Sequence, residues 1–549
     1  NRGQFVAHGV ARALREAGLL QRARYLATTS GSVWFGLALS YQTQDSLEEL
    51  LGQSLPPEDL SPEALVGADA GTAITRLGTW PLFSVYPRGY TPTTALRSLQ
   101  ATQAQNETLV KALGLSRRDA LELLKCMRDM DFAACIVDKA IPDSSLQDAW
   151  TIGSSILFMH PLGLAQPGSL HCHETEQKRV QNQIDDNTKL YVARDISLGL
   201  PFGIQQSAII APYTGREGSN LTFFPVEHTA LYTGTPGSYA GARAYPYDGV
   251  GDVLVSSYAW PGAALQTVSE ANASEARVRL RHNLWNVGQV SSVAGIATNY
   301  MADWQIRPWT AKLPKFAVAL LEKVLPRVPI WSPLDSDGRG TPRTQALPVG
   351  DAGIYDDIGH IPLLRRKVSK MLMVDSSAIH DTSTGADREN ICEMVYLYAA
   401  FGQSSCLGPE YRPGSPNPVM QAGTMQVFEA AEFAPLMRAV NESHARGEPA
   451  VHRRRLNVLS NDFLGIEGGW QVDVVIVVVL PSTRWTSRVP RQTQRLLKPY
   501  FPNYVSTEMK SHMEFSAVSQ FASWLTHSAV VKEVREMLDG RNASDYIAV

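Results

Sequence analysis

The chain has 549 residues, of which 44% are hydrophobic and 19% are charged, and its formal net charge is −3. This composition is typical of a globular protein with ample apolar material for a core, which excludes a largely disordered chain. The near-neutral charge gives no overall electrostatic footprint for nucleic acid, and no polybasic segment suits strong attraction to anionic lipid. The longest strongly apolar run, 474–480, has seven residues and predicts a buried strand, because a membrane span needs about 20.

A helix, a short strand and a second helix are predicted at the start of the chain, with Ser30 in the turn before the second helix. Tyr25-Leu26-Ala27 is typical of a buried strand, and a helical spacing of apolar residues restarts at Trp34. At the start of that helix, unpaired N–H groups and the helix dipole favour negative charge developing on a bound oxygen. Ser30 is therefore a candidate nucleophile for acyl transfer. The first helix is indicated by Val6, Val10, Ala13, Leu14 and Ala17, with Gly18 as its stop.

The order of these elements separates two classes of serine hydrolase. In the α/β-hydrolase pattern several strands precede the nucleophile, and its partners follow as Asp or Glu and then His. Only one helix and one strand precede Ser30, which resembles the patatin and cytosolic phospholipase A2 arrangement instead. That resemblance implies a Ser/Asp dyad without histidine, whose aspartate lies far downstream in an Asp-x-Gly turn. Asp351-Ala352-Gly353 is such a turn, so Asp351 is the second candidate.

Four segments resemble motifs of the cytosolic phospholipase A2 and fungal phospholipase B family, in that family's order. Residues 351–377 are similar to its Asp-x-Gly, Ile-Pro-Leu and Val-Asp-Ser-Ser sequence, and Ser30-Gly31-Ser32-x-Trp34 is similar to its nucleophile motif. Weaker matches lie at 223–227 and 285–292, so the resemblance spans roughly residues 1–380. It implies an α/β fold with a patatin or cytosolic phospholipase A2-like three-layer α/β/α core and an inserted cap region.

The resemblance also assigns roles beside the dyad. The family carries a glycine-rich loop ending in arginine, whose N–H groups form the oxyanion hole while the arginine faces the lipid phosphate. Counting back from Ser30 places this phosphate-binding arginine at Arg2, with the main glycines and the first core strand expected before residue 1; the Gly31 N–H is expected to join the oxyanion hole. Thr28 departs from the family's glycine, and a stiff β-branched residue there is expected to cost stability or tilt the serine.

These residues predict hydrolysis of the acyl esters of glycerophospholipids or lysophospholipids through an acyl-serine intermediate. No cofactor and no metal at the chemical step are implied. The expected partner is a phospholipid membrane surface or micelle, without nucleic acid. One alternative is a patatin-like acyl hydrolase acting on non-phospholipid esters. The other is a catalytically impaired lipid-binding or scaffold homologue, which the departure at Thr28 makes conceivable.

The chain is predicted to consist of a catalytic domain at 1–400, with 46–190 as a cap or insertion, and a C-terminal extension at 401–549 packed on the core. The aromatic segment 80–90 is a candidate lid or interfacial segment, and Asp375 is expected to be a strand-end or capping residue. Further helices are expected at 109–130 and 518–538, strands at 206–212 and 470–480, and Pro/Gly-rich loops at 331–350 and 407–420.

Two clusters of potential metal ligands lead to no metal prediction. His171-Cys172-His173-Glu174 lacks a further partner at zinc-like spacing, and Asp356, Asp357 and His360 lie inside a family segment that binds no metal.

Cysteines and glycosylation sequons indicate different compartments. The five cysteines are too few and too scattered for a disulfide framework, and their odd number favours a reducing compartment. Sequons favour a secretory pathway instead, and five are present, at Asn106, Asn220, Asn272, Asn441 and Asn542. The compartment stays open, with the cytoplasm and peripheral membrane contact favoured over secretion.

Overall fold

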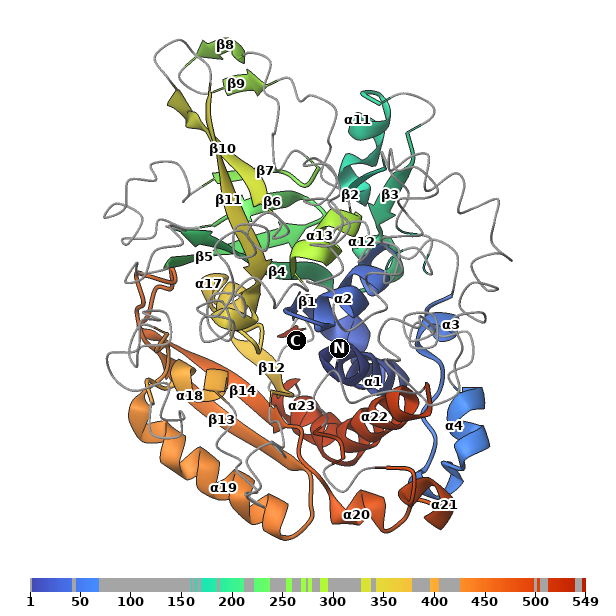
Figure 1. The fold of residues 1–549 in the computed structure, drawn as a ribbon. Coiled ribbons are helices and arrows are strands. Elements are labelled where there is room, and N and C mark those ends of the chain that lie inside the picture. The colour runs from blue at the N-terminus through green and yellow to red at the C-terminus, as the bar shows by residue number, and fades with distance from the viewer. Residues whose placement is uncertain are drawn as a thin grey trace, which may run out of the picture.

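The computed structural model describes residues 2–41, 46–68, 159, 162, 164, 169–184, 188–211, 222–236, 253–258, 268–272, 275–278, 287–294, 327–336, 342–377, 395–403, 425–497, 501–503, 512–538 and 546–549. The fold described below is that of these residues (Figure 1). Among them, no helix combines the length and the apolar character needed to cross a membrane.

Helices and strands alternate along the described chain. The α-helices are α1 (Arg2–Glu16), α2 (Ser32–Tyr41), α3 (Leu47–Leu51), α4 (Pro62–Ala68), α11 (Gln177–Gln181), α12 (Asp195–Leu198), α13 (Val287–Ala294), α17 (Ile361–Arg365), α18 (Val395–Ala400), α19 (Phe433–Ala445), α20 (Thr483–Thr486), α21 (Arg491–Gln494), α22 (His512–Leu525) and α23 (Val531–Leu538). The strands are β1 (Ala23–Thr28), β2 (Leu170–His173), β3 (Leu190–Ala193), β4 (Phe202–Ala211), β5 (Thr222–Thr229), β6 (Tyr232–Thr235), β7 (Val253–Ser256), β8 (Val268–Asn272), β9 (Glu275–Val278), β10 (Arg327–Ser336), β11 (Pro342–Asp351), β12 (Lys370–Asp375), β13 (Ala450–Val458), β14 (Trp470–Val478) and β15 (Ile547–Ala548).

A large mixed sheet runs through the molecule. It has 11 strands in the order β13-β14-β12-β15-β1-β4-β5-β6-β7, and the β10–β11 hairpin joins it through β4 (Figure 1). Strands β14, β12, β15, β1 and β4 are parallel neighbours, and antiparallel strands flank them on both sides. The predicted α/β class is therefore confirmed.

Both faces of the sheet are covered by helices. In β14, Val475 and Val477 belong to the apolar core under α1, α2 and α22, whereas Val474 and Ile476 belong to the core under α17, α18 and α19. A strand that is buried on both faces is apolar at every position, which explains its run of valines and isoleucine. The described helices and the sheet thus form three layers (Figure 1).

Strand β4 brings the ends of two other strands together. β1 runs parallel to β4 and pairs with it as far as Thr28 opposite Gln205. β11 runs antiparallel to β4 and ends with Asp351 opposite Ser207. Since β5 pairs with the other edge of β4 from Ile204 to Ala211, β1 and β11 share one edge and their carboxyl ends meet near Gln206. The turns that follow the two strands therefore face each other.

The expectation that 401–549 is an extension packed on the core is wrong in one respect. This part of the chain supplies β13, β14 and β15 to the central sheet, and β15 lies between β1 and β12. The expectation relied on the lack of a family motif beyond residue 400, but a strand joins a sheet through backbone pairing, which needs no motif. The remaining domain division, including the cap at 46–190, stays a prediction.

The predicted Pro/Gly-rich loop at 331–350 is also wrong, because most of it belongs to the antiparallel hairpin β10–β11. Proline lacks an N–H and is tolerated where a strand has a free edge. β10 pairs only with β11 among the described strands, and this leaves its other edge free of ladder bonds to them.

Several predicted elements agree with the structure. The strands expected at 25–27, 206–212 and 470–480 correspond to β1, β4 and β14, and the helix expected at 518–538 corresponds to α22 and α23 joined by a π-helical turn, Thr526–Val530. The predicted helix at 109–130, the segment 80–90 and the loop at 407–420 lie outside the described residues.

Candidate active site

Ser30 lies in a strained turn between β1 and α2. Its backbone φ is 51°, in the left-handed region that residues other than glycine rarely adopt. Two hydrogen bonds of Ser32 stabilise the turn. Its Oγ donates to the Thr29 carbonyl at 2.6 Å and accepts the Thr29 N–H at 2.9 Å. Such a conformation costs of the order of 1–2 kcal/mol and is found preferentially at functional sites.

The Ser30 hydroxyl donates a hydrogen bond to Asp351. Ser30 Oγ lies 2.6 Å from Asp351 Oδ2, although 321 positions separate the two residues along the chain. Asp351 ends β11 and caps the following 3-10 turn, where its Oδ1 accepts the Gly353 N–H at 2.8 Å. The carboxylate is thus oriented through one oxygen and faces the serine with the other.

Burial shapes the acidity of this carboxylate. Only 4% of Asp351 is exposed, and burial raises its pKa from 3.8 to about 6, against the lowering effect of the hydrogen bonds from Ser30 and Gly353. A carboxylate with a pKa near the working pH is suited to accept and return a proton. The arrangement can therefore move a proton between a hydroxyl and a base.

Thr28 fits beside the turn because of a glycine in α2. A Cβ on Gly36 would lie 2.6 Å from Thr28 Oγ1 and 2.9 Å from Thr28 Cγ2. The threonine thus occupies the space that a side chain at position 36 would need. Its Oγ1 is buried and has no hydrogen-bond partner among the described residues. No local sequence pattern indicates this pairing, since the two residues belong to different elements.

Arg2 lies at the start of α1 and is only 7% exposed. Its guanidinium donates to the Ser376 carbonyl just after β12. Burial lowers the pKa of Arg2 to about 10, while Asp357 and Asp375 act in the opposite direction. The arginine thus lies among carboxylates and a carbonyl, and its role in phosphate binding stays a prediction.

Asp357 and Asp375 add two buried carboxyl groups near the dyad. Burial, together with the charges of Asp351 and Asp375, raises the pKa of Asp357 well above its usual value. Asp357 Oδ1 and Asp351 Oδ1 lie 3.0 and 3.2 Å from the point where a Cβ on Gly353 would sit, so a side chain there would press on both carboxyl groups. Asp375 ends β12 and accepts the Ser377 N–H at 2.8 Å, as expected of a strand-end residue. No sequence pattern marks Asp357 as a neighbour of the dyad.

Gly31 is buried between Ser30 and the first residue of α2. This is the position that a donor at the helix N-terminus would occupy, and its part in an oxyanion hole stays a prediction.

The two weaker motif segments hold structural contacts. Glu227 of β5 is buried and forms ion pairs with Arg365 and Arg366 at 3.2 and 2.6 Å. Trp34 in α2 donates from Nε1 to the Ser291 carbonyl of α13 at 3.1 Å. These contacts brace the elements around the dyad and do not reach it.

Asp356 and His360 form a buried structural pair. Asp356 Oδ1 accepts from His360 Nδ1 at 2.8 Å, and its Oδ2 accepts from Gln206 Nε2 at 3.1 Å and from the Ile361 N–H at 3.0 Å. The Asp356 carboxylate is therefore already occupied by hydrogen bonds from its neighbours.

Comparison with known proteins assigns neither a family nor a function to the chain. No protein-family model and no curated protein matches the chain. Among solved structures, the chain is similar to human GIVD cytosolic phospholipase A2, with 13% identity and a TM-score of 0.35 over 98% of this chain and 64% of that chain. The chain thus spans less than two thirds of that structure. A TM-score this low carries no argument about this chain, so its fold and its site are argued from its own residues.

Proposed function

We propose that the protein is a serine acyl hydrolase of the phospholipase A2 or lysophospholipase class, with Ser30 as nucleophile and Asp351 as its base. The main support is the 2.6 Å hydrogen bond between the Ser30 hydroxyl and the buried Asp351 carboxylate. A serine that merely caps a helix needs neither a left-handed backbone nor a buried carboxylate of raised pKa beside it.

The reaction has two steps. In the first, Ser30 Oγ attacks the ester carbonyl while Asp351 takes the hydroxyl proton; the ester C–O bond then breaks, and the leaving alcohol receives that proton. In the second, a water molecule gives a proton to Asp351 and attacks the acyl-serine. The fatty acid leaves, and the proton returns to Ser30 Oγ.

Each of the two attacks forms a tetrahedral intermediate, and hydrogen-bond donors are needed to stabilise the negative charge on its oxygen. The Gly31 N–H and the N-terminal end of α2 supply part of this stabilisation, and one such donor is typically worth about 3 kcal/mol.

The role of Arg2 separates two classes of substrate. If it binds phosphate, the substrates are glycerophospholipids or lysophospholipids. The contact of its guanidinium with the Ser376 carbonyl, beside Asp357 and Asp375, favours a second candidate, an acyl hydrolase of esters without phosphate. Arg2→Ala is expected to lower kcat/KM on a lysophospholipid but not on a monoacylglycerol under the first reading. If the substrates are esters without phosphate, Arg2→Ala is expected to lower kcat/KM on both compounds or on neither.

Covalent labelling by a fluorophosphonate probe tests the nucleophile. The wild-type chain is expected to be labelled, and Ser30→Ala is expected to lose the label while it keeps its fold. Ser46→Ala is a matched control, because Ser46 also lies at a helix N-terminus, where it caps α3. Labelling that survives Ser30→Ala would contradict the assignment. A folded wild-type chain that takes no label would favour the lipid-binding or scaffold alternative.

A further inference from the structure

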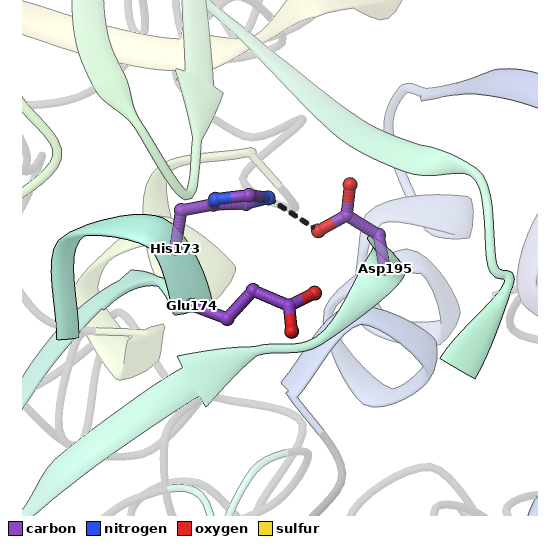
Figure 2. Close-up of side chains that lie close together, drawn as sticks. All are labelled: His173, Glu174 and Asp195. Carbon is purple, nitrogen blue, oxygen red and sulfur yellow. Dashed lines mark ion pairs between the residues drawn. The ribbon is translucent and has the colours of Figure 1, made fainter. Parts of the chain in front are cut away.

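Three potential metal ligands converge in the small sheet β2–β3, outside the candidate active site. His173 ends β2 and Glu174 follows it, while Asp195 begins α12 just after β3. The two strands are parallel, with His173 opposite Ala193, so their carboxyl ends lie at the same edge. One ligand atom from each of the three residues lies within 4.8 Å of the others, and the side chains point into one gap (Figure 2).

The contact between His173 and Asp195 is short but poorly directed. His173 Nε2 lies 2.7 Å from Asp195 Oδ1 (Figure 2). Asp195 Oδ1 is nevertheless a buried atom that accepts no hydrogen bond from the described residues, so the pair has the distance of an ion pair without the direction of a hydrogen bond. A buried carboxylate oxygen without a donor is a position that a cation would stabilise.

The second ring nitrogen of His173 is already oriented. His173 Nδ1 lies 2.7 Å from Thr175 Oγ1, and only 3% of His173 is exposed. Histidines that bind metal through one nitrogen commonly donate the other N–H to an oxygen, which fixes the ring. Nδ1 also accepts the Thr175 backbone N–H at 3.2 Å, which places the ring proton of the ion-free chain on Nε2. An ion bound to Nε2 requires the other tautomer, in which Nδ1–H donates to Thr175 Oγ1 and the bond from the Thr175 N–H is given up.

Glu174 is held in place from the other side. Its Oε1 accepts the Ser197 N–H of α12 at 2.9 Å. This bond keeps the carboxylate close to Asp195. Glu174 and Asp195 are both partly exposed, so an ion can reach the gap from solvent and keep water ligands there.

We propose that His173, Glu174 and Asp195 bind one divalent transition-metal ion such as Zn²⁺. One imidazole nitrogen and two carboxylate oxygens are ligands that zinc accepts, and water completes the coordination. Ligands about 2.0–2.2 Å from zinc in a tetrahedron lie about 3.3 Å apart, so Asp195 moves outward by about half an ångström as the ion enters.

The role of this ion is structural. The His173 ring lies 6.0 Å from the ring of Phe202, at the amino end of β4. Phe202 pairs with Tyr25, near the start of β1, whereas Ser30 follows the other end of β1. The ion ties the end of β2 to the start of α12, and it stabilises the folded chain because the unfolded chain lacks the assembled site.

Zinc titration of the full chain tests the site. After treatment with a chelator, the protein is titrated with ZnCl₂ by calorimetry, with MgCl₂ as comparator, and its thermal unfolding is followed. One equivalent of zinc is expected to bind and to raise the Tm. Asp195→Asn and Glu174→Gln are expected to weaken binding by at least about tenfold. Both variants keep the side-chain shape, and the amide introduced by Glu174→Gln keeps an oxygen for the Ser197 N–H.

His527→Ala is the matched control. His527 Nε2 also lies 2.7 Å from a carboxylate, Glu16 Oε2, but this pair belongs to no three-donor group among the described residues. Its zinc affinity is expected to equal that of the wild type. The proposal is overturned if folded wild-type protein binds no zinc, if it binds Mg²⁺ as tightly as Zn²⁺, or if Asp195→Asn binds zinc unchanged. None of these results bears on Ser30.

Discussion

At the scale of single residues, the candidate site concentrates features that are unfavourable for folding. Ser30 adopts a left-handed backbone, Asp351 is a buried carboxylate, and Thr28 holds a buried hydroxyl without a partner among the described residues. Each of these costs free energy of folding, of the order of 1–3 kcal/mol. Such a concentration is typical of a site shaped for chemistry rather than for stability.

Replacement of Asp351 tests this trade-off. Its pKa in the folded chain is about 6, above the usual 3.8, so the folded chain is more stable with this carboxyl protonated than with it ionised. This stabilisation is fully present below pH 3.8 and is lost as the pH rises through 6. Asp351→Asn resembles the protonated carboxyl and is expected to raise the free energy of unfolding at pH 7 by up to about 3 kcal/mol. The gain should shrink toward pH 4, and hydrolysis should be lost. Urea unfolding at both pH values measures it.

The pH dependence of hydrolysis by the wild-type chain gives a second measurement of the same group. In the proposed mechanism Asp351 acts as a base, so kcat/KM is expected to rise with pH through about 6. An acidic limb near the usual 3.8, together with an Asp351→Asn variant that is less stable at pH 7, would show that the carboxylate is stabilised by its surroundings and would contradict the argument.

At the scale of elements, β1 and α2 are matched to each other through Thr28 and Gly36. The helix lies close enough to the strand that a Cβ at position 36 would overlap the threonine side chain. Close packing between a strand and the helix after it fixes the positions of the two elements that flank Ser30.

A double-mutant cycle tests this match. Gly36→Ala is expected to destabilise the wild-type chain by about 1–3 kcal/mol, because it overpacks the contact with Thr28. In a Thr28→Gly background the same change is expected to be neutral or stabilising, since alanine favours helix and the clash is gone. The coupling should exceed about 1 kcal/mol in denaturant unfolding. Additive effects would show that the two side chains do not share this space.

At the scale of the whole molecule, distant segments complete the sheet that carries the dyad. β15 pairs with β1 on one side and with β12 on the other. The Val549 N–H donates to the Tyr25 carbonyl at 2.9 Å, and the Val549 carbonyl accepts the Ala27 N–H at 2.7 Å. The strand before Ser30 is thus supported by residues from the opposite end of the sequence.

A buried charge in β15 tests this dependence. Ala548 is fully buried between β1 and β12, and Ala548→Glu is expected to destabilise the chain by about 3–5 kcal/mol and to reduce labelling of Ser30. Tyr546→Glu is the control, because Tyr546 is 51% exposed and a change there should stay within about 0.5 kcal/mol. Equal stability of the two variants in thermal unfolding would contradict the placement of β15.

How much could be predicted from the sequence depends on the range of the interaction. The helix, strand and turn around Ser30 follow from local periodicity, and the turn at Asp351 follows from a short motif. The fit of Thr28 against Gly36, the neighbours of Arg2 and the approach of Asp195 to His173 could not be predicted, because each joins elements that no local pattern relates. The catalytic roles of Ser30 and Asp351 themselves stay a proposal.

The sequence by itself determined the α/β class, the positions of β1, β4 and β14, and the residue types able to carry acyl-transfer chemistry, because spacing and polarity act over a few residues. Only the tertiary structure decided that β13, β14 and β15 complete the central sheet and that β1 and β11 meet end to end on one edge of β4. The physical reason is that backbone hydrogen bonding between strands is nearly independent of sequence. Which strands pair, and hence which side chains meet, is therefore decided by how the whole apolar surface is buried.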